Sequence, residues 1–172
     1  RVGAGQALNG TPVDCVRVGL TALDWDVDWV VSGVNAGGNL GWDVYPSGTA
    51  AAAREAAFLG KPAAAVSQYI RKDMTIDWEC ATEWTRRVME RLLERPPKSR
   101  EFWNVNLPHL NPGEACPEVV HCPLDRSPLA VEYRREGDVF HYASNYHGRP
   151  AEPHGDVAVC FSGRVAVSQV SL

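Results

Sequence analysis

The chain has 172 residues, of which 45% are hydrophobic and 22% charged, a composition typical of a globular domain with a hydrophobic core. Its formal net charge of −4 argues against a nucleic-acid polymer as a partner, because binding to the phosphate backbone is favoured by a basic surface. No apolar run approaches the roughly 18 residues that cross a bilayer, so we expect no membrane span.

The cysteines are odd in number and irregularly spaced, which argues against a disulfide framework. They are Cys15, Cys80, Cys116, Cys122 and Cys160. Two of them lie near histidines, but the spacing matches no usual zinc pattern, and we interpret these residues as parts of loops and strands. Reduced, mostly packed thiols predict a cytoplasmic protein.

The first predicted element is a helix that begins at Thr11. Thr11 can cap the helix, Pro12 suits its first position, and Asp14 favours the positive end of its dipole. Apolar residues then recur at helical spacing as far as Leu23.

Short apolar strands alternate with helices over the next part of the chain. The predicted strands are 27–31, 62–66 and 102–107, and the predicted helices are 47–59 and 77–93. Gly60 is typical of a helix C-terminus, and Pro96 stops the longer helix. The alternation predicts an α/β fold with three layers, in which crossover helices cover a mostly parallel sheet.

The pattern changes after Pro108. Two alternating runs around Glu136-Gly137-Asp138 predict a protruding β-hairpin at about 129–144, with a basic surface at Arg134 and Arg135. A polar loop follows, and residues 164–172 read as a last strand. We expect one α/β domain over residues 1–172 with this hairpin as an arm.

The segment SGVNAGGNLGWDVYPSGTAAAAREAAFLG, residues 32–60, joins a buried strand to an alanine-rich helix. Ligands of α/β sheets bind beyond the carboxyl ends of the strands, where this segment begins. Ser47 can cap the helix, Gly48 allows close approach of a ligand, and Thr49 adds a hydroxyl group. The free N–H groups and the helix dipole there favour an anion. The alternative is a capped, tightly packed helix that binds nothing.

Two common phosphate motifs are absent. Lys61 precedes a proline instead of the Ser or Thr of a P-loop, and no Gly-x-Gly-x-x-Gly sequence opens a helix. Five other segments occur in a recognisable order and spacing: GTPVDCV, VSGVNAGGNLG, SGTAAAA, NVNLP and GDVAVCFSGRVAVSQVSL. Together they resemble the SurE family (survival protein E) along nearly the whole chain. SurE proteins are metal-dependent nucleotidases that hydrolyse nucleoside 5′- or 3′-monophosphates.

The resemblance implies roles for individual residues. Asn35 matches a metal-ligand asparagine, and its amide oxygen is a hard donor that suits Mg²⁺ or Mn²⁺. Asn39, Ser47, Gly48 and Thr49 match the phosphate-binding part of the family's pocket. The family also suggests a homodimer or tetramer in which the hairpin is exchanged between subunits.

One family motif has no counterpart in the chain. SurE proteins begin with a strand ending in Asn-Asp-Asp-Gly, whose aspartates hold the metal, and this sequence contains no Asp-Asp pair. We therefore expect residues 1–172 alone to bind a divalent metal weakly, to show no metal-dependent phosphatase activity, and to expose apolar surface at the edge of the sheet. An Asn-Asp-Asp-Gly sequence upstream of Arg1 in the encoding gene would decide for the enzyme. A phosphate-ligand binding module or an oligomerisation domain without turnover is the alternative.

The six tryptophans are interpreted as core and interface residues, because their rings supply a large apolar area. Trp42 is the exception. It lies within the glycine-rich segment, where stacking against a nucleobase is an alternative role.

Overall fold

The computed structural model describes residues 5–71, 74–111, 113–129 and 131–172. The α-helices are α1 (Pro12–Arg17), α2 (Gly48–Phe58), α3 (Trp78–Leu93) and α4 (Asp156–Phe161). The strands are β1 (Val30–Ala36), β2 (Ala63–Gln68), β3 (Glu101–Leu107), β4 (Val119–His121), β5 (Tyr133–Glu136), β6 (Val139–Tyr142) and β7 (Val165–Ser171). Shorter helical turns are η1 (Val18–Ala22), η2 (Gly41–Val44) and η3 (Tyr146–Gly148). Within these ranges, no helix is long and apolar enough to cross a membrane.

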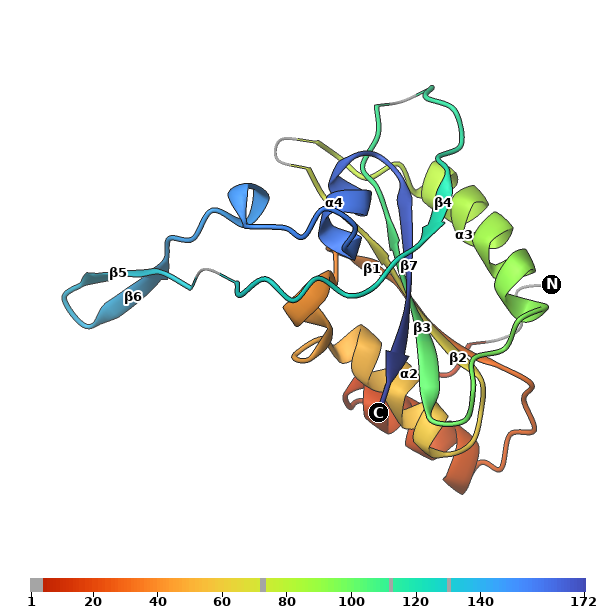
Figure 1. The fold of residues 1–172 in the computed structure, drawn as a ribbon. Coiled ribbons are helices and arrows are strands. Elements are labelled where there is room, and N and C mark those ends of the chain that lie inside the picture. Colours follow the sequence, from red (N-terminus) through yellow and green to blue (C-terminus); the bar gives the residue numbers. More distant parts are fainter. Residues whose placement is uncertain (1–4, 72–73, 112, 130) are drawn as a thin grey trace.

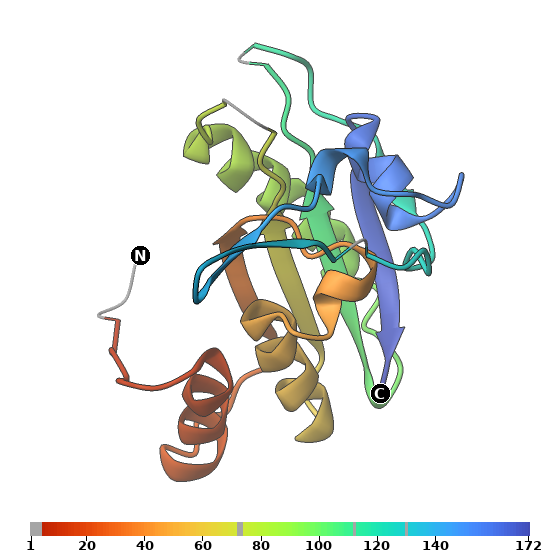
Figure 2. The same ribbon diagram turned by 90° about the vertical axis from the view of Figure 1, so that its left-hand side faces the viewer.

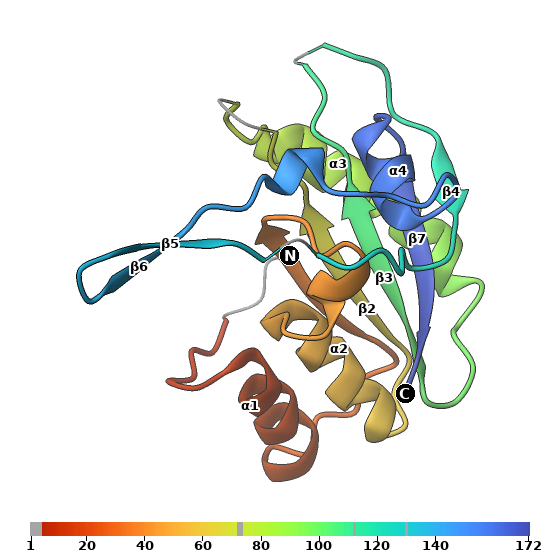
Figure 3. The same ribbon diagram turned by 60° about the vertical axis from the view of Figure 1, so that its left-hand side comes forward.

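The five-stranded sheet has the order β1-β2-β3-β7-β4 (Figure 1). The pairs β1–β2, β2–β3 and β4–β7 are parallel, and only β3–β7 is antiparallel. Helices cover both faces, and the expected three-layer, mostly parallel α/β fold is confirmed (Figure 3). The carboxyl ends of β1, β2 and β3 therefore meet at one edge of the sheet.

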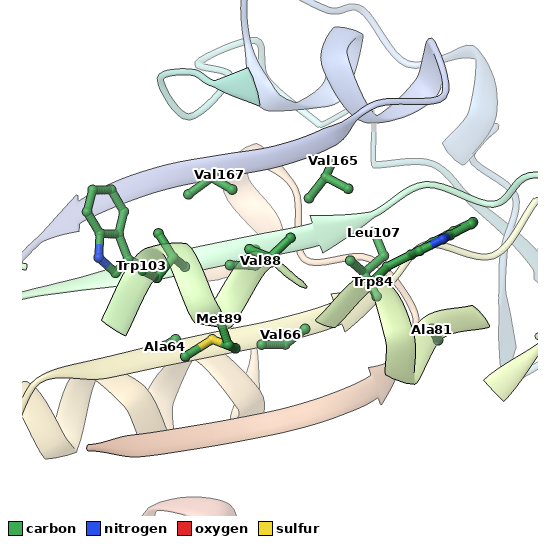
Figure 4. Close-up of a cluster of buried hydrophobic side chains, with 12 residues drawn as sticks. Ala64, Val66, Ala81, Trp84, Val88, Met89, Trp103, Leu107, Val165 and Val167 are labelled. Carbon is green, nitrogen blue, oxygen red and sulfur yellow. The ribbon is translucent and has the colours of Figure 1, made fainter. Parts of the chain in front are cut away.

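One face of the sheet packs against α3. The apolar side chains of this helix recur every three or four residues, so they form one stripe, and Figure 4 shows this stripe against β2, β3 and β7. Asp77 caps the helix by accepting hydrogen bonds from the backbone of Glu79 and Cys80, both at 3.0 Å. The apolar stripe of α3 and its cap thus hold this helix against the sheet, below the edge where β2 and β3 end.

The other face packs against α2 and α4, and α1 packs on the outside of α2. Buried alanines of α2 contact Ala63, Ala65 and Phe102 of the sheet, so the helix lies close to the strands. As expected, Ser47 caps α2 by accepting a hydrogen bond from Ala50 N at 3.1 Å. Since α2 connects β1 to β2, its N-terminus lies near the carboxyl end of β1.

The N-terminus of α1 has the expected cap. Thr11 Oγ1 accepts from Asp14 N at 3.2 Å, and Asp14 Oδ2 accepts from Thr11 N at 2.9 Å. Hydrogen bonds from the hydroxyl and the N–H of Thr11 lower the pKa of the Asp14 carboxyl.

Thr11→Ala is expected to lower the free energy of unfolding by about 1 kcal/mol, because the substitution leaves a first-turn N–H without its acceptor. Thr11→Ser keeps the hydroxyl and is the matched control, expected to stay close to the unsubstituted protein. Urea denaturation at neutral and acidic pH measures both. A group whose pKa is lowered by folding stabilises the fold above its unfolded pKa, so the difference should shrink in acid. Equal losses for alanine and serine would contradict the cap.

The predicted elements differ from the observed ones mainly at β1 and after Pro108. The strand expected at 27–31 runs instead from Val30 to Ala36, because the chain passes Gly33 and Val34 in an irregular register and then resumes pairing with β2 at Asn35. The short elements β4, η2 and α4 were not predicted. The first helix also ends early as an α-helix and continues as a π-helical turn, η1.

The expected hairpin consists of β5 and β6 and extends away from the sheet (Figures 1 and 2). All eight of its strand residues are exposed. Residue 130, within the range expected for the arm, lies outside the described residues. Of the tryptophans interpreted as core and interface residues, Trp84 and Trp103 are buried in the core, whereas Trp25 and Trp78 are about half exposed.

Candidate functional site

The site begins where β1 approaches β2 unusually closely. Gly33 has a φ of 128°, a conformation that favours glycine, and a Cβ at this position would lie 2.2 Å from the carbonyl oxygen of Val66. The register resumes with Asn35 beside Ser67. Asn35 therefore lies within β1 at its carboxyl end, and not in the loop after the strand as the sequence predicts.

The side chain of Asn35 is partly buried. Its Nδ2 donates to the carbonyl oxygen of Gly37 at 2.8 Å, which fixes the orientation of the amide. Among the described residues, no hydrogen bond to Asn35 Oδ1 is present, so this oxygen remains available to a ligand.

Asn39 is held by a buried polar network. Its backbone N–H donates to Asn106 Oδ1 at 2.8 Å, and its carbonyl oxygen accepts from Asn104 Nδ2 at 2.9 Å and from Asn106 Nδ2 at 3.0 Å. Its own Nδ2 donates to Ser67 Oγ at 2.6 Å. Asn104, Asn106 and Ser67 are fully buried, so the glycine-rich loop is attached directly to β2 and β3. The amide nitrogen of Asn39 thus faces the sheet.

The first turn of α2 presents free donors. Ser47 Oγ accepts from Ala50 N, and Ser47 O accepts from Ala51 N. In the described part of the chain, the N–H groups of Gly48 and Thr49 and the Thr49 hydroxyl have no hydrogen-bond partner. With the positive end of the helix dipole, this turn is suited to an anion.

Two buried charged groups fasten the loop between Asn39 and Ser47. Arg149 Nη1 donates to Asp43 Oδ2 at 2.8 Å, and Nη2 donates to the carbonyl oxygen of Leu40 at 3.1 Å. The Tyr146 hydroxyl donates to the same Asp43 oxygen at 2.8 Å, and the guanidinium group lies 5.1 Å from the centre of the Tyr146 ring. Burial raises the pKa of Tyr146, and the charge of Asp43 raises it further.

Asp156 at the start of α4 is the second of these groups. Its two oxygens accept from Gly41 N and from Asp125 N, both at 2.8 Å. Burial raises the pKa of this carboxyl although these N–H groups stabilise its charged form. The carboxylate therefore joins the glycine-rich loop to the segment that precedes the hairpin.

The structure thus places the predicted residues at one edge of the sheet, but each on a different structural element. Asn35 ends β1, Asn39 lies against β2 and β3, and the turn 47–49 opens α2. Asn104, Asn106 and the Asp43–Arg149 pair hold the loop in place but were not predicted from the sequence. The spacing of Asn104 and Asn106 in β3 could have indicated a shared polar role for these two residues, since amides at i and i+2 face the same side of a strand. No comparable signal links Asp43 to Arg149.

A glycine-rich loop and a free helix N-terminus at the carboxyl edge of a parallel sheet define an α/β protein with a candidate anion site. Residues 3–127 match the family described as Survival protein SurE. The chain belongs to the SurE family.

Individual relatives agree with this assignment. A Nostoc sp. protein, provisionally named 5′-nucleotidase alr3139, is 50% identical over 164 residues, covering 95% of this chain and 73% of the relative. A protein of Pseudoalteromonas atlantica named 5′-nucleotidase SurE is 43% identical over 109 residues, which cover 63% of this chain and 43% of the relative. The crystal structure of the SurE protein from Aquifex aeolicus superposes with a TM-score of 0.78 at 28% identity, covering 95% of this chain and 67% of that one.

Proposed function

We propose that this protein is a phosphomonoester hydrolase, a SurE-like nucleotidase that acts on nucleoside 5′- or 3′-monophosphates. The observation that carries the proposal is the free first turn of α2 beside the carboxyl end of β1. Relatives named 5′-nucleotidase support the type of reaction.

In this proposal the phosphate group lies against the N–H groups of Gly48 and Thr49 and the Thr49 hydroxyl. Ser47 holds the turn open as its cap, and Asn39 forms the wall of the pocket on the side of the sheet. Fixed donors aimed at the phosphoryl oxygens would stabilise the charge that develops on them during the reaction. The polar network around Asn39 keeps these donors in place without rearrangement.

We propose Asn35 Oδ1 as one ligand of a divalent cation, Mg²⁺ or Mn²⁺, on the basis of the resemblance to SurE proteins. The residues that the structure describes do not fit a complete site for such an ion. They contain no group of three or more His, Cys, Asp or Glu side chains that could hold a metal. Mg²⁺ is usually held by one or two carboxylates, and an amide oxygen alone is a weak substitute.

The oligomeric state of the protein belongs to the same proposal. We propose a homodimer or tetramer that forms through the β5–β6 hairpin at about 129–144, as an arm of a single domain. Val139, Phe140 and Tyr142 are each more than half exposed, and an isolated two-stranded hairpin is only marginally stable in water. The described cysteines are all free, which supports a cytoplasmic location.

Asn35→Ala in the full gene product is expected to reduce the turnover of a nucleoside monophosphate at least tenfold, a barrier increase of about 1.4 kcal/mol. The reason is the loss of the one available oxygen ligand at the end of β1. Phosphate release at limiting Mn²⁺, with and without a chelator, measures the effect. Asn35→Asp keeps an oxygen ligand and is the matched control, expected to retain much more activity. Unchanged turnover in the alanine variant would remove Asn35 from the ligand set.

The second candidate function is a phosphate-binding or oligomerisation module without turnover. It is favoured by the lack of clustered carboxylates around Asn35 in the described residues. The full gene product distinguishes the two: phosphate-induced shifts of the Gly48 and Thr49 amide signals, without any release of phosphate from a nucleotide, would favour binding alone. Absence of both effects would favour the oligomerisation domain.

A further inference from the structure

A cavity of about 600 Å³ opens beyond the carboxyl ends of β2 and β3. Its walls come from the end of β2, the turn η3 and the end of α4. The residues that matter for its chemistry are Tyr69, Arg71, Asn145, His147 and Phe161.

Aromatic rings form one wall of this cavity. The rings of Tyr69 and Phe161 stack with centres 4.8 Å apart and planes inclined by 24°. The His147 ring meets Tyr69 edge-on at 5.8 Å, and the Tyr69 hydroxyl lies 2.6 Å from His147 Nδ1. Tyr69 is 6% exposed, whereas Phe161 is partly exposed and His147 is exposed. Two rings therefore remain accessible, and Tyr69 holds both in place.

Polar groups surround this wall. Asn145 Oδ1 accepts from Gly148 N at 3.1 Å, and within the described residues its Nδ2 has no hydrogen-bond acceptor. Arg71 adds a positive charge on the side of β2. A flat ring with acceptor atoms at its rim fits this combination of an aromatic face and free donors.

The cavity lies close to Asn35 and to the glycine-rich loop of the candidate site. Asn35 pairs with Ser67 in the sheet, and Tyr69 follows two residues later. Strands about 4.8 Å apart that rise about 3.3 Å per residue place the backbone of Tyr69 about 8 Å from that of Asn35. A Cβ built on Gly38 would contact Tyr69 at 3.6 Å, so the glycine-rich loop packs directly against the cavity wall. One nucleotide could therefore reach from a phosphate beside Asn35 to a base in the cavity.

We propose that this cavity is the subsite that binds the base of the nucleoside monophosphate, with Phe161 and His147 as its contact surface. The inference rests on the proposed function of the neighbouring phosphate site. Ring stacking requires a planar aromatic ligand but no particular base, so purines and pyrimidines both enter. Arg71 and Asn145 hydrogen-bond to acceptor atoms of the base and set the preference among bases.

The test uses Phe161→Leu, which keeps apolar volume but removes the ring, and His147→Ala at an exposed position. In the full gene product, each is expected to raise KM for a nucleoside monophosphate about tenfold and to leave kcat nearly unchanged. The kinetics with ribose 5-phosphate, which lacks a base, should not change. Phe58→Leu replaces an exposed ring on α2 outside the cavity and is the control. Equal changes for both substrates, or no change for either, would overturn the proposal.

A second measurement separates this proposal from the proposed function. Titration of residues 1–172 with adenosine or uridine, which carry no phosphate, is expected to shift the NMR signals of Phe161 and His147, and Phe161→Leu should weaken the binding. This result requires no turnover. If the nucleosides shift only the signals of Trp42, the base binds at the other exposed ring and the cavity is not the subsite. If nucleosides bind here but no nucleotide is hydrolysed, the proposed function fails and the subsite stands.

Discussion

Gly33→Ala is expected to destabilise the fold by more than about 3 kcal/mol and to abolish phosphate binding at the neighbouring site. A methyl group at this position would lie 2.2 Å from Val66 O, well inside contact distance, and that oxygen belongs to the backbone of the adjacent strand. The overlap cannot be relieved by rotating a side chain, so β1 and β2 must separate. Asn35 follows two residues later and would move with β1.

The control for this substitution is Gly60→Ala. Gly60 also has a positive φ, 77°, but a Cβ there would meet nothing within 4 Å. Gly60→Ala therefore measures only the cost of placing a side chain at a positive φ, about 1–2 kcal/mol. Urea denaturation of both variants gives the comparison, and phosphate titration monitored by NMR reports the site. Similar destabilisation in the two variants would show that the approach of β1 to Val66 is not essential.

The elements with strong local signals were predictable from the sequence. Asp77, the apolar stripe and the following prolines located α3 to within one residue of its observed start. Ser47 and Gly60 did the same for α2. In both helices the ends are determined by groups within a few residues of one another, so the sequence contains the relevant interactions directly.

The end of β1 was not predictable in this way. Ser32 and Gly33 resemble loop residues, and the strand continues through them because Ser32 pairs with Ala65 of β2 and Asn35 pairs again with Ser67. The short helix α4 has only six residues, too few to show a helical period, and its role depends on Asp156 reaching Gly41 across 115 positions. Such elements are specified by contacts between distant segments.

The candidate site was also predictable only where the signal is local. The sequence indicated Ser47–Thr49 as a helix start, and the resemblance to SurE directed attention to Asn35 and Asn39. Neither could show that the amide of Asn39 faces Ser67, since that contact depends on the order of the strands. The aromatic cavity was not predicted because Tyr69 and Phe161 lie in separate segments, each with too little local pattern to indicate a binding surface.

Arg149→Met is expected to lower the free energy of unfolding by about 3 kcal/mol, near the lower limit for breaking a buried ion pair. The side chain of Arg149 is 2% exposed and that of Asp43 is 18% exposed, so the partner left behind is only partly able to recover its hydration. Methionine retains most of the apolar contact but provides no donor for Asp43 or for the carbonyl oxygen of Leu40. The loop from Leu40 to Val44 should therefore loosen, and nucleotide turnover should fall with it.

Two further variants show whether the charge pair itself is responsible. Asp43→Asn combined with Arg149→Met removes both charges and is expected to be more stable than Arg149→Met alone, because no unpaired carboxylate remains. Arg86→Met on α3 breaks surface pairs with Glu83 and Glu90, where the arginine side chain is 54% exposed, and should change stability far less than Arg149→Met. Urea denaturation of the four proteins gives the energies. If Arg149→Met were no more destabilising than Arg86→Met, the pair would not be what fastens the glycine-rich loop, and the loop would depend instead on Asp156 and on the amides of β3.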